Sequence, residues 1–269
     1  MRIRPSRVLR KLRAGGAVSC FKLNLSCARA AQIAAALGFD CVWTDMEHTA
    51  TQWSDVEKQI MAAKAHDADV MVRVPRGSYS DYIKPLELDA AGIMVPHCMS
   101  LADAQFVVRT TRFHPIGRRP VDGGNADGLY CNIPFREYIQ QANKERFVAI
   151  QIEDPEPLAE LDRIASLEGI DMIFFGPGDF SHGIGVPGEL DHPQVREIRR
   201  RVAKVALANG KFAGTMGSPE NLAELLDMGY RFINMGADVL GLSAYCRELV
   251  AEFETTSASI LPEPVALIN

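Results

Sequence analysis

The sequence has few of the features that mark membrane, disulfide-linked or nucleic-acid-binding proteins. Its six cysteines are scattered without a C-x-x-C pair, so we expect free thiols in a reducing compartment rather than disulfides or a zinc knuckle. No window approaches the ~20 apolar residues that a membrane span needs. Lys and Arg number 29 against 34 Asp and Glu, a net charge of −5 that argues against nucleic-acid or membrane partners. We therefore expect a soluble, cytoplasmic protein.

The first residues are the one strongly basic stretch. Residues 1–16 contain several arginines and no acid, and they end in Gly15 and Gly16. A transit peptide would look similar, whereas a secretory signal would need an apolar stretch that is absent here. We interpret residues 1–16 as a short leading helix.

Apolar, β-branched runs alternate with segments of helical period along the whole chain. The expected strands are residues 17–23, 41–45, 70–74, 92–96, 147–152, 172–175, 212–216 and 232–235. The expected helices include residues 28–37, 53–65, 101–111, 157–165, 195–208 and 222–228. Alternation of this kind produces parallel βαβ units, and a length of 269 residues suits one (β/α)₈ (TIM) barrel of ~250 residues. We predict one α/β barrel domain over residues 1–269. An open doubly wound sheet is the alternative, but no G-x-G-x-x-G motif supports it.

One connection is much longer than the others. Between the fourth and fifth expected strands, residues 112–145 form a loop or insert whose first part is rich in Gly, Arg, Asp and Pro. Long connections in compact domains are often functional, so we expect this one to rise from the C-terminal face, where barrel enzymes place their active sites. Residues 238–253 are apolar with a helical pattern, and we expect a C-terminal helix there.

Two acids follow neighbouring strands and are candidate metal ligands. Glu153 ends the fifth expected strand and Asp179 follows the sixth. Carboxylates on adjacent strand ends can share one cation, and oxygen ligands suit Mg²⁺ or Mn²⁺, with Co²⁺ also possible. The alternative is that either acid only caps the next helix.

The segment before Asp179 is a candidate carboxylate site. Gly176, Pro177 and Gly178 carry little side-chain bulk, so the backbone N–H groups of this segment could hold a substrate carboxylate. Ordinary turn formation explains the same residues equally well.

Other polar residues also end apolar strands. Arg73 could stabilise an enolate oxygen or form a salt bridge. Asp45 could orient His48 as a general base, and His97, His114 and His182 are further candidate bases. An imine-forming aldolase needs a lysine inside the barrel, a position that only Lys22 suits, so a metal enolate fits the sequence better.

These segments together resemble the HpcH/HpaI family of metal-dependent class II pyruvate aldolases over residues 16–242. The matching motifs are residues 38–40, 45–48, 72–75, 92–96, 151–153 and 175–181. The resemblance implies reversible cleavage of 4-hydroxy-2-oxo (or 2-oxo-3-deoxy) acids to pyruvate and an aldehyde through a metal-stabilised enolate. It also implies a homo-oligomer, a trimer or hexamer.

The resemblance assigns roles to particular residues. Glu153 and Asp179 would bind the metal, Gln151 would position its ligands, and the backbone around Pro177, Gly178 and Asp179 would hold the carboxylate of pyruvate. Arg73 would stabilise the enolate oxygen, and His48 paired with Asp45 would act as base. Asp89 matches an acid that reaches the histidine of a neighbouring subunit. Val239 and Leu240 would shape the aldehyde pocket.

The sequence departs from the family pattern at two places. Met46 stands where a glycine is common, and residues 118–124 replace a usual Arg-Gly pair in a loop expected to border the aldehyde. The acceptor aldehyde therefore stays open. The alternatives are a citrate- or malyl-type acyl-CoA lyase, an oxaloacetate decarboxylase on the same scaffold, and a noncatalytic 2-oxo-acid-binding barrel.

Overall fold

The computed structural model describes residues 1–261, in which eight parallel strands close into a barrel in sequence order. The strands are β1 (Val18–Leu23), β2 (Cys41–Asp45), β3 (Asp69–Arg73), β4 (Gly92–Val95), β5 (Phe147–Ile152), β6 (Met172–Phe175), β7 (Phe212–Met216) and β8 (Phe232–Ala237). Strand β1 pairs with both β2 and β8, so the sheet has no free edge. The predicted barrel is confirmed, and four of the strands have the predicted bounds.

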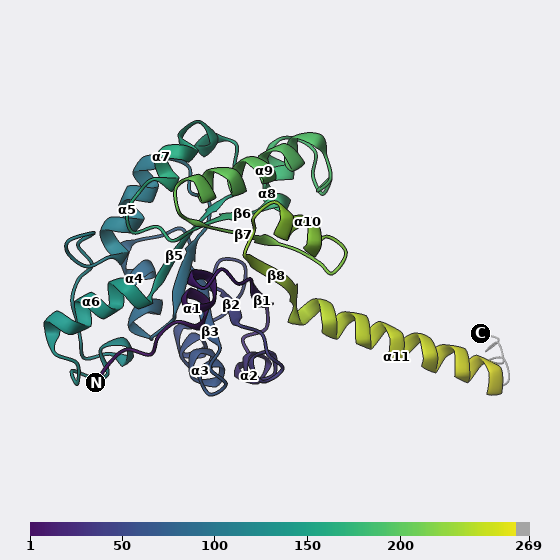
Figure 1. The fold of residues 1–269 in the computed structure, drawn as a ribbon. Helices are drawn as coiled ribbons and strands as arrows, with labels where there is room; N and C mark the ends of the chain where they lie inside the picture. Colours follow the sequence, from purple (N-terminus) through teal and green to yellow (C-terminus); the bar gives the residue numbers. More distant parts are fainter. Residues whose placement is uncertain (262–269) are drawn as a thin grey trace.

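Helices surround this barrel, as Figure 1 shows. They are α1 (Arg7–Arg13), α2 (Ala28–Ala36), α3 (Trp53–Lys64), α4 (Tyr79–Glu87), α5 (Leu101–Thr111), α6 (Phe135–Glu145), α7 (Leu161–Ala165), α8 (Pro177–Gly183), α9 (Pro193–Ala208), α10 (Leu222–Asp227) and α11 (Asp238–Ile260), with short 3₁₀ turns at Ala126–Gly128 and Glu156–Glu160. Helices α4 and α6 are not among the helices expected from the sequence. Helix α4 contains Pro85, and α6 is mostly polar, with Tyr138 and Ala142 as its buried residues.

Alternation along each strand divides the core into two layers. Residues such as Val42, Val70 and Ile150 point outward and pack under the helices. Their neighbours point into the barrel, where Trp43, Met71 and other side chains fill the interior. Because side chains alternate with a period of two, the inward positions continue upward to polar residues at the ends of the strands.

Helix α1 packs against the N-terminal end of the barrel. Its Val8, Leu9 and Leu12 are buried in the interior cluster. Asp69 at the start of β3 accepts hydrogen bonds from Ser6 Oγ at 2.5 Å and from the backbone N–H of Val8 at 2.9 Å. Four basic residues of this segment also form ion pairs within the fold, with Asp40, Asp67 or Asp69: Arg4, Arg7, Arg10 and Lys11.

The expectation that the long connection rises from the C-terminal face is wrong. Helix α5 directly follows β4 and returns the chain to the other end of the barrel. Arg112, the first residue after α5, donates to the carbonyls of Gly169 at 2.7 Å and Arg146 at 2.7 Å, which precede β6 and β5. Residues 112–134 therefore lie toward the N-terminal end of this barrel and do not border its own mouth.

Helix α11 differs from the other helices because it projects away from the barrel (Figure 1). None of its residues is buried. It extends past the predicted residue 253, to Ile260. In the part of the chain that the structure describes, no helix is both long and apolar enough to cross a membrane.

Candidate active site

The top layer of the barrel interior is polar and charged. Inward positions below it hold apolar residues, and the next inward positions hold Lys22 on β1, Asp45 on β2, Arg73 on β3 and Gln151 on β5. Glu153 follows Gln151 by two residues and lies on the same side. Parallel strands bring their carboxyl ends to one rim, so residues far apart in sequence meet at the mouth.

Arg73 and two carboxylates form a buried network. Arg73 donates to both oxygens of Asp45, from Nε at 3.0 Å and from a terminal nitrogen at 2.5 Å. Its other terminal nitrogen lies 3.0 Å from Glu47. Lys22 Nζ lies 2.9 Å from the same Asp45 carboxylate. Burial alone would raise the pKa of Asp45, but hydrogen bonds from Arg73 and Lys22 lower this pKa to about 2.

The expected pair between Asp45 and the imidazole of His48 is not formed. Asp45 points into the barrel, where Arg73 and Lys22 bind its oxygens, and it accepts the backbone N–H of His48 at 3.4 Å. The imidazole is half exposed, and its Nε2 lies 3.4 Å from Glu47. Glu47 is therefore the acid beside this imidazole. The sequence did not predict this partner, although alternation places residues 45 and 47 on one face.

Glu153 is buried at the end of β5 with little positive charge around it. Gln151 Nε2 and the backbone N–H of His97 donate to its two oxygens, the latter at 2.9 Å. Burial raises the pKa of Glu153 to about 7; His97 lowers this pKa, and the nearby Asp179 raises it. The Oε1 atom of Gln151 is also buried and has no hydrogen-bond partner within residues 1–261.

The residues at the ends of β5 and β6 fit a divalent cation. Buried carboxylate charge is costly unless a cation compensates it, and Glu153 and Asp179 both offer hard oxygen ligands. Gly176 leaves the necessary space, because a Cβ there would lie 2.7 Å from Glu153 Oε2. Gly178 and Asp179, in the first turn of α8 after β6, are exposed. Within the described residues no group of three acids, histidines or cysteines is arranged to hold a metal ion. The ligands that the protein would supply are the carboxylates of Glu153 and Asp179.

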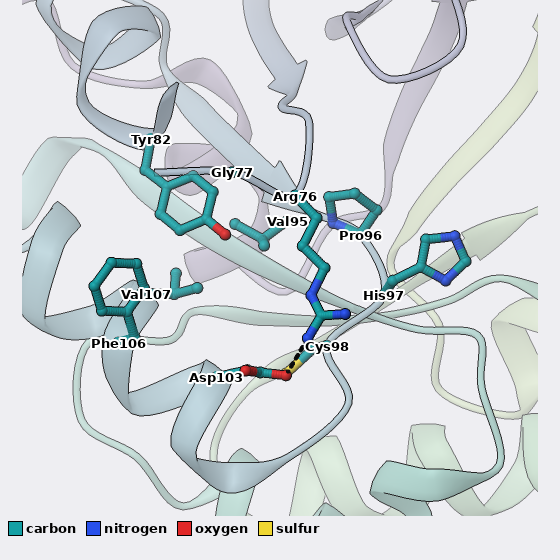
Figure 2. A pocket seen from close by; sticks show the side chains of 10 residues that line it. All are labelled: Arg76, Gly77, Tyr82, Val95, Pro96, His97, Cys98, Asp103, Phe106 and Val107. Atoms are coloured by element: carbon teal, nitrogen blue, oxygen red, sulfur yellow. Dashed lines mark hydrogen bonds and ion pairs between the residues drawn. The ribbon is translucent and has the colours of Figure 1, made fainter. Parts of the chain in front are cut away.

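His97 links the mouth to a neighbouring pocket. Its backbone is left-handed, with φ of 46°, and its Nδ1 lies 2.9 Å from Asp154 while its Nε2 lies 3.6 Å from Glu47. Burial lowers the pKa of His97, but the surrounding carboxylates raise it overall. His97 also lines a pocket of about 380 Å³ between α4 and α5 (Figure 2), where Arg76 points toward Asp103 at 2.9 Å.

The structure does not bring Asp89 to this mouth. Asp89 precedes β4, at the N-terminal end of the barrel, where its carboxylate pairs with Lys64 and Arg146. Val239 and Leu240 begin α11 beside the end of β8 and are half-buried and exposed, respectively. Asp238 binds the backbone N–H groups of Asn24 and Leu25 at 2.8 and 3.0 Å, which ties the start of α11 to the loop after β1.

Comparison with known proteins agrees with this geometry. A family model described as HpcH/HpaI aldolase/citrate lyase matches residues 19–243. The chain is 32% identical to a hydroxypyruvate/pyruvate aldolase of Pseudomonas aeruginosa, covering 93% of each protein. It is 31% identical to a 4-hydroxy-2-oxo-heptane-1,7-dioate aldolase of Shigella sonnei, covering 89% of this chain and 92% of that one. The crystal structure of an HpcH/HpaI aldolase from Desulfitobacterium hafniense superposes with a TM-score of 0.85 at 27% identity, covering 95% of this chain and 97% of that one.

These matches extend over nearly the whole chain and include the strand ends that carry the polar residues. They favour an enzyme over a noncatalytic barrel. The chain is a carbon–carbon lyase, and it belongs to the HpcH/HpaI aldolase/citrate lyase family.

Proposed function

We propose that the chain is a divalent-cation-dependent aldolase that reversibly cleaves 4-hydroxy-2-oxo or 2-oxo-3-deoxy acids to pyruvate, or a close 2-oxo acid, and an aldehyde. The main support is the pair Glu153 and Asp179, a buried and an exposed carboxylate at the ends of neighbouring strands, with no cation of the chain paired to Asp179 within residues 1–261. The names of two relatives, which are aldolases of pyruvate and of a 4-hydroxy-2-oxo acid, agree with this proposal.

In the proposed reaction the bond between C3 and C4 breaks. A base takes the proton of the 4-hydroxyl group, and the O–H electrons form the carbonyl of the aldehyde. The electron pair of the C3–C4 bond passes into the 2-oxo acid as its enolate, and a proton then adds to C3. The protonated product is pyruvate when C3 carries no other substituent.

Residues of the chain would bind the substrate groups on which charge develops. Glu153 and Asp179 would hold Mg²⁺ or Mn²⁺, with Co²⁺ as a substitute, and Gln151 would orient Glu153. When bound, such a cation supplies Lewis-acid polarisation of the 2-oxo group. The backbone at Pro177, Gly178 and Asp179 would face the substrate carboxylate.

Arg73 would use the N–H groups not bonded to Asp45 and Glu47 to stabilise the enolate oxygen. His48, beside Glu47, would be the base, with Val239 and Leu240 at the aldehyde side.

The first experiment measures pyruvate release from a racemic 4-hydroxy-2-oxo acid before and after EDTA, with Mg²⁺, Mn²⁺ or Co²⁺ restored. We expect chelation to abolish turnover, metal to restore it, Glu153→Gln to lose at least ~10³-fold in kcat, and His48→Ala to lose ~10²-fold or more. Glu168→Gln, an exposed acid in the connection that precedes β6 at the opposite end of the barrel, is the matched control. Turnover that survives EDTA and Glu153→Gln would contradict the metal mechanism. Absent turnover would direct attention to acyl-CoA lyase or oxaloacetate decarboxylase chemistry.

The exposed helix α11 supports a homo-oligomer. Its exposed apolar residues include Leu240, Leu242, Tyr245, Val250 and Phe253. Contiguous apolar surface of this kind marks interaction sites. We propose that α11 packs against another copy of the chain, in the trimer or hexamer that the family resemblance implies. The molar mass in solution tests this, and Phe253→Asp combined with Val250→Asp should lower it.

We also propose that the protein is cytoplasmic. The six cysteines are free, and three of them (Cys20, Cys41 and Cys98) are buried. Free thiols persist where glutathione and thioredoxin keep them reduced. The partners that we expect are the small 2-oxo acid and the aldehyde.

A further inference from the structure

The wall of the mouth opposite the two carboxylates carries a lysine that the proposed reaction does not use. In a closed barrel of eight strands in sequence order, β1 lies across from β5. Glu153 follows β5, and Lys22 is the last inward residue of β1, one step above Cys20 of the interior cluster. A substrate that spans the mouth from Glu153 and Asp179 to the opposite wall would therefore meet Lys22.

Lys22 is held in place but still reachable. Its Nζ lies 2.9 Å from Asp45 and 5.1 Å from the ring centroid of Trp43. The side chain is 16% exposed, so it is not sealed within the barrel interior. Arg73 binds both oxygens of Asp45 and also Glu47, and Lys22 supplies the second positive charge beside these two carboxylates. An ammonium carries three N–H donors, and one ion pair leaves donors for a ligand.

We propose that Lys22 is a specificity-determining residue that binds a carboxylate on the acceptor half of the substrate; this inference rests on the proposed aldolase function. The charges on the two walls favour that orientation. The β5 and β6 wall would already hold the cation and the carboxylate of the 2-oxo acid half, whereas the β1 wall presents the ammonium of Lys22 to the acceptor half. A single ammonium suits a carboxylate, whereas phosphate sites usually gather several N–H donors.

The test compares two aldehydes of two carbons, glyoxylate, which carries a carboxylate, and glycolaldehyde, which does not. Aldol addition of pyruvate to each is measured with metal-loaded enzyme, and the quantity is the ratio of kcat/KM for glyoxylate to that for glycolaldehyde. We expect Lys22→Met to lower this ratio by ~30-fold, the effect of losing one charge-assisted hydrogen bond. Lys22→Arg should restore most of the ratio. Lys58→Met, which removes an exposed lysine on α3, should leave it unchanged.

Each outcome decides the inference. An unchanged ratio in Lys22→Met, with both rates reduced equally, would show that Lys22 acts only through Asp45 and would overturn the proposal. If Lys22→Met does not fold, Lys22→Gln carries the same comparison with a neutral side chain of similar polarity. If the wild type adds pyruvate to glycolaldehyde but does not prefer glyoxylate, the aldolase function holds and the role of Lys22 falls. If it turns over neither aldehyde, the proposed function itself fails, and this inference fails with it.

Discussion

The two ends of the barrel both contain buried acids, but their surroundings differ. At the N-terminal end, Asp40 is bound by Arg7, Lys11 and the backbone of Ser19, and its pKa is lowered because these bonds outweigh the effect of burial. At the C-terminal end, Glu153 has no lysine or arginine bound to it, and burial raises its pKa to about 7. Acids with full sets of partners stabilise a fold, whereas acids left without them are typical of functional sites. The comparison therefore contrasts an acid held by basic partners with one that has none; Asp45 at the mouth, which Arg73 and Lys22 bind, resembles Asp40 in this respect.

Loss of a satisfied acid should have the largest effect on stability. Asp69 is fully buried and binds Arg4, Ser6 and Val8 across the junction of α1 and β3. Asp69→Ala would leave these donors without their acceptor, and we expect a loss of ~3–5 kcal/mol in the free energy of unfolding. Urea denaturation measures it. A loss below ~1 kcal/mol would mean that the N-terminal acids do not hold α1 in place.

Loss of Glu153, the acid without a basic partner, should instead stabilise the metal-free protein at high pH. Because the folded pKa of Glu153 lies above that of an ordinary carboxyl, the folded state retains this proton to higher pH than the unfolded state does. Stability should therefore fall as pH rises from about 4.5 to about 7, by at most ~3 kcal/mol. In EDTA, Glu153→Gln should flatten this decline and melt higher than wild type at pH 8.

Added Mn²⁺ sharpens the same comparison. It should raise the melting temperature of wild type at pH 8, because a ligand that binds the folded state stabilises it, and should do so much less in Glu153→Gln. Equal shifts in both proteins would place the cation elsewhere.

The smallest effect is expected at the rim of the neighbouring pocket. Arg76 and Asp103 form an ion pair with side chains 49% and 35% exposed (Figure 2). Exposed pairs contribute little, so Arg76→Ala should change the free energy of unfolding by no more than ~0.5 kcal/mol. A loss of several kcal/mol would show that exposure is a poor guide to the role of charges around this barrel. Differential scanning fluorimetry of Asp69→Ala, Glu153→Gln and Arg76→Ala side by side compares the melting temperatures of all three variants.

Much of the fold could be predicted from the sequence because its signals are local. Apolar runs such as residues 147–152 and 172–175 have the predicted bounds. Four glycines that follow helices, Gly38, Gly169, Gly210 and Gly229, all have positive φ, a conformation that glycine adopts at no steric cost. The helices that were missed, α4 and α6, have weak local signals, since one contains a proline and the other buries little.

Less of the site could be predicted, because side-chain partners depend on strands distant in sequence. The sequence marked Arg73, Glu153, Asp179, Gln151 and His48 as strand-end residues, and the structure places them around one mouth. The sequence did not reveal that Arg73 binds both oxygens of Asp45, or that Glu47 lies beside both His48 and His97.

By itself, the sequence determined that eight apolar strands alternate with helices and that polar residues follow those strands, because hydrophobic period and residue type are local properties. The tertiary structure alone decided which of these residues meet. Closure of the barrel places Lys22 across from Glu153, turns residues 112–134 toward the opposite end, and pairs Asp45 with Arg73 rather than with the imidazole of His48. Those relations follow from how eight strands join into a ring, and no single segment of the chain encodes that geometry.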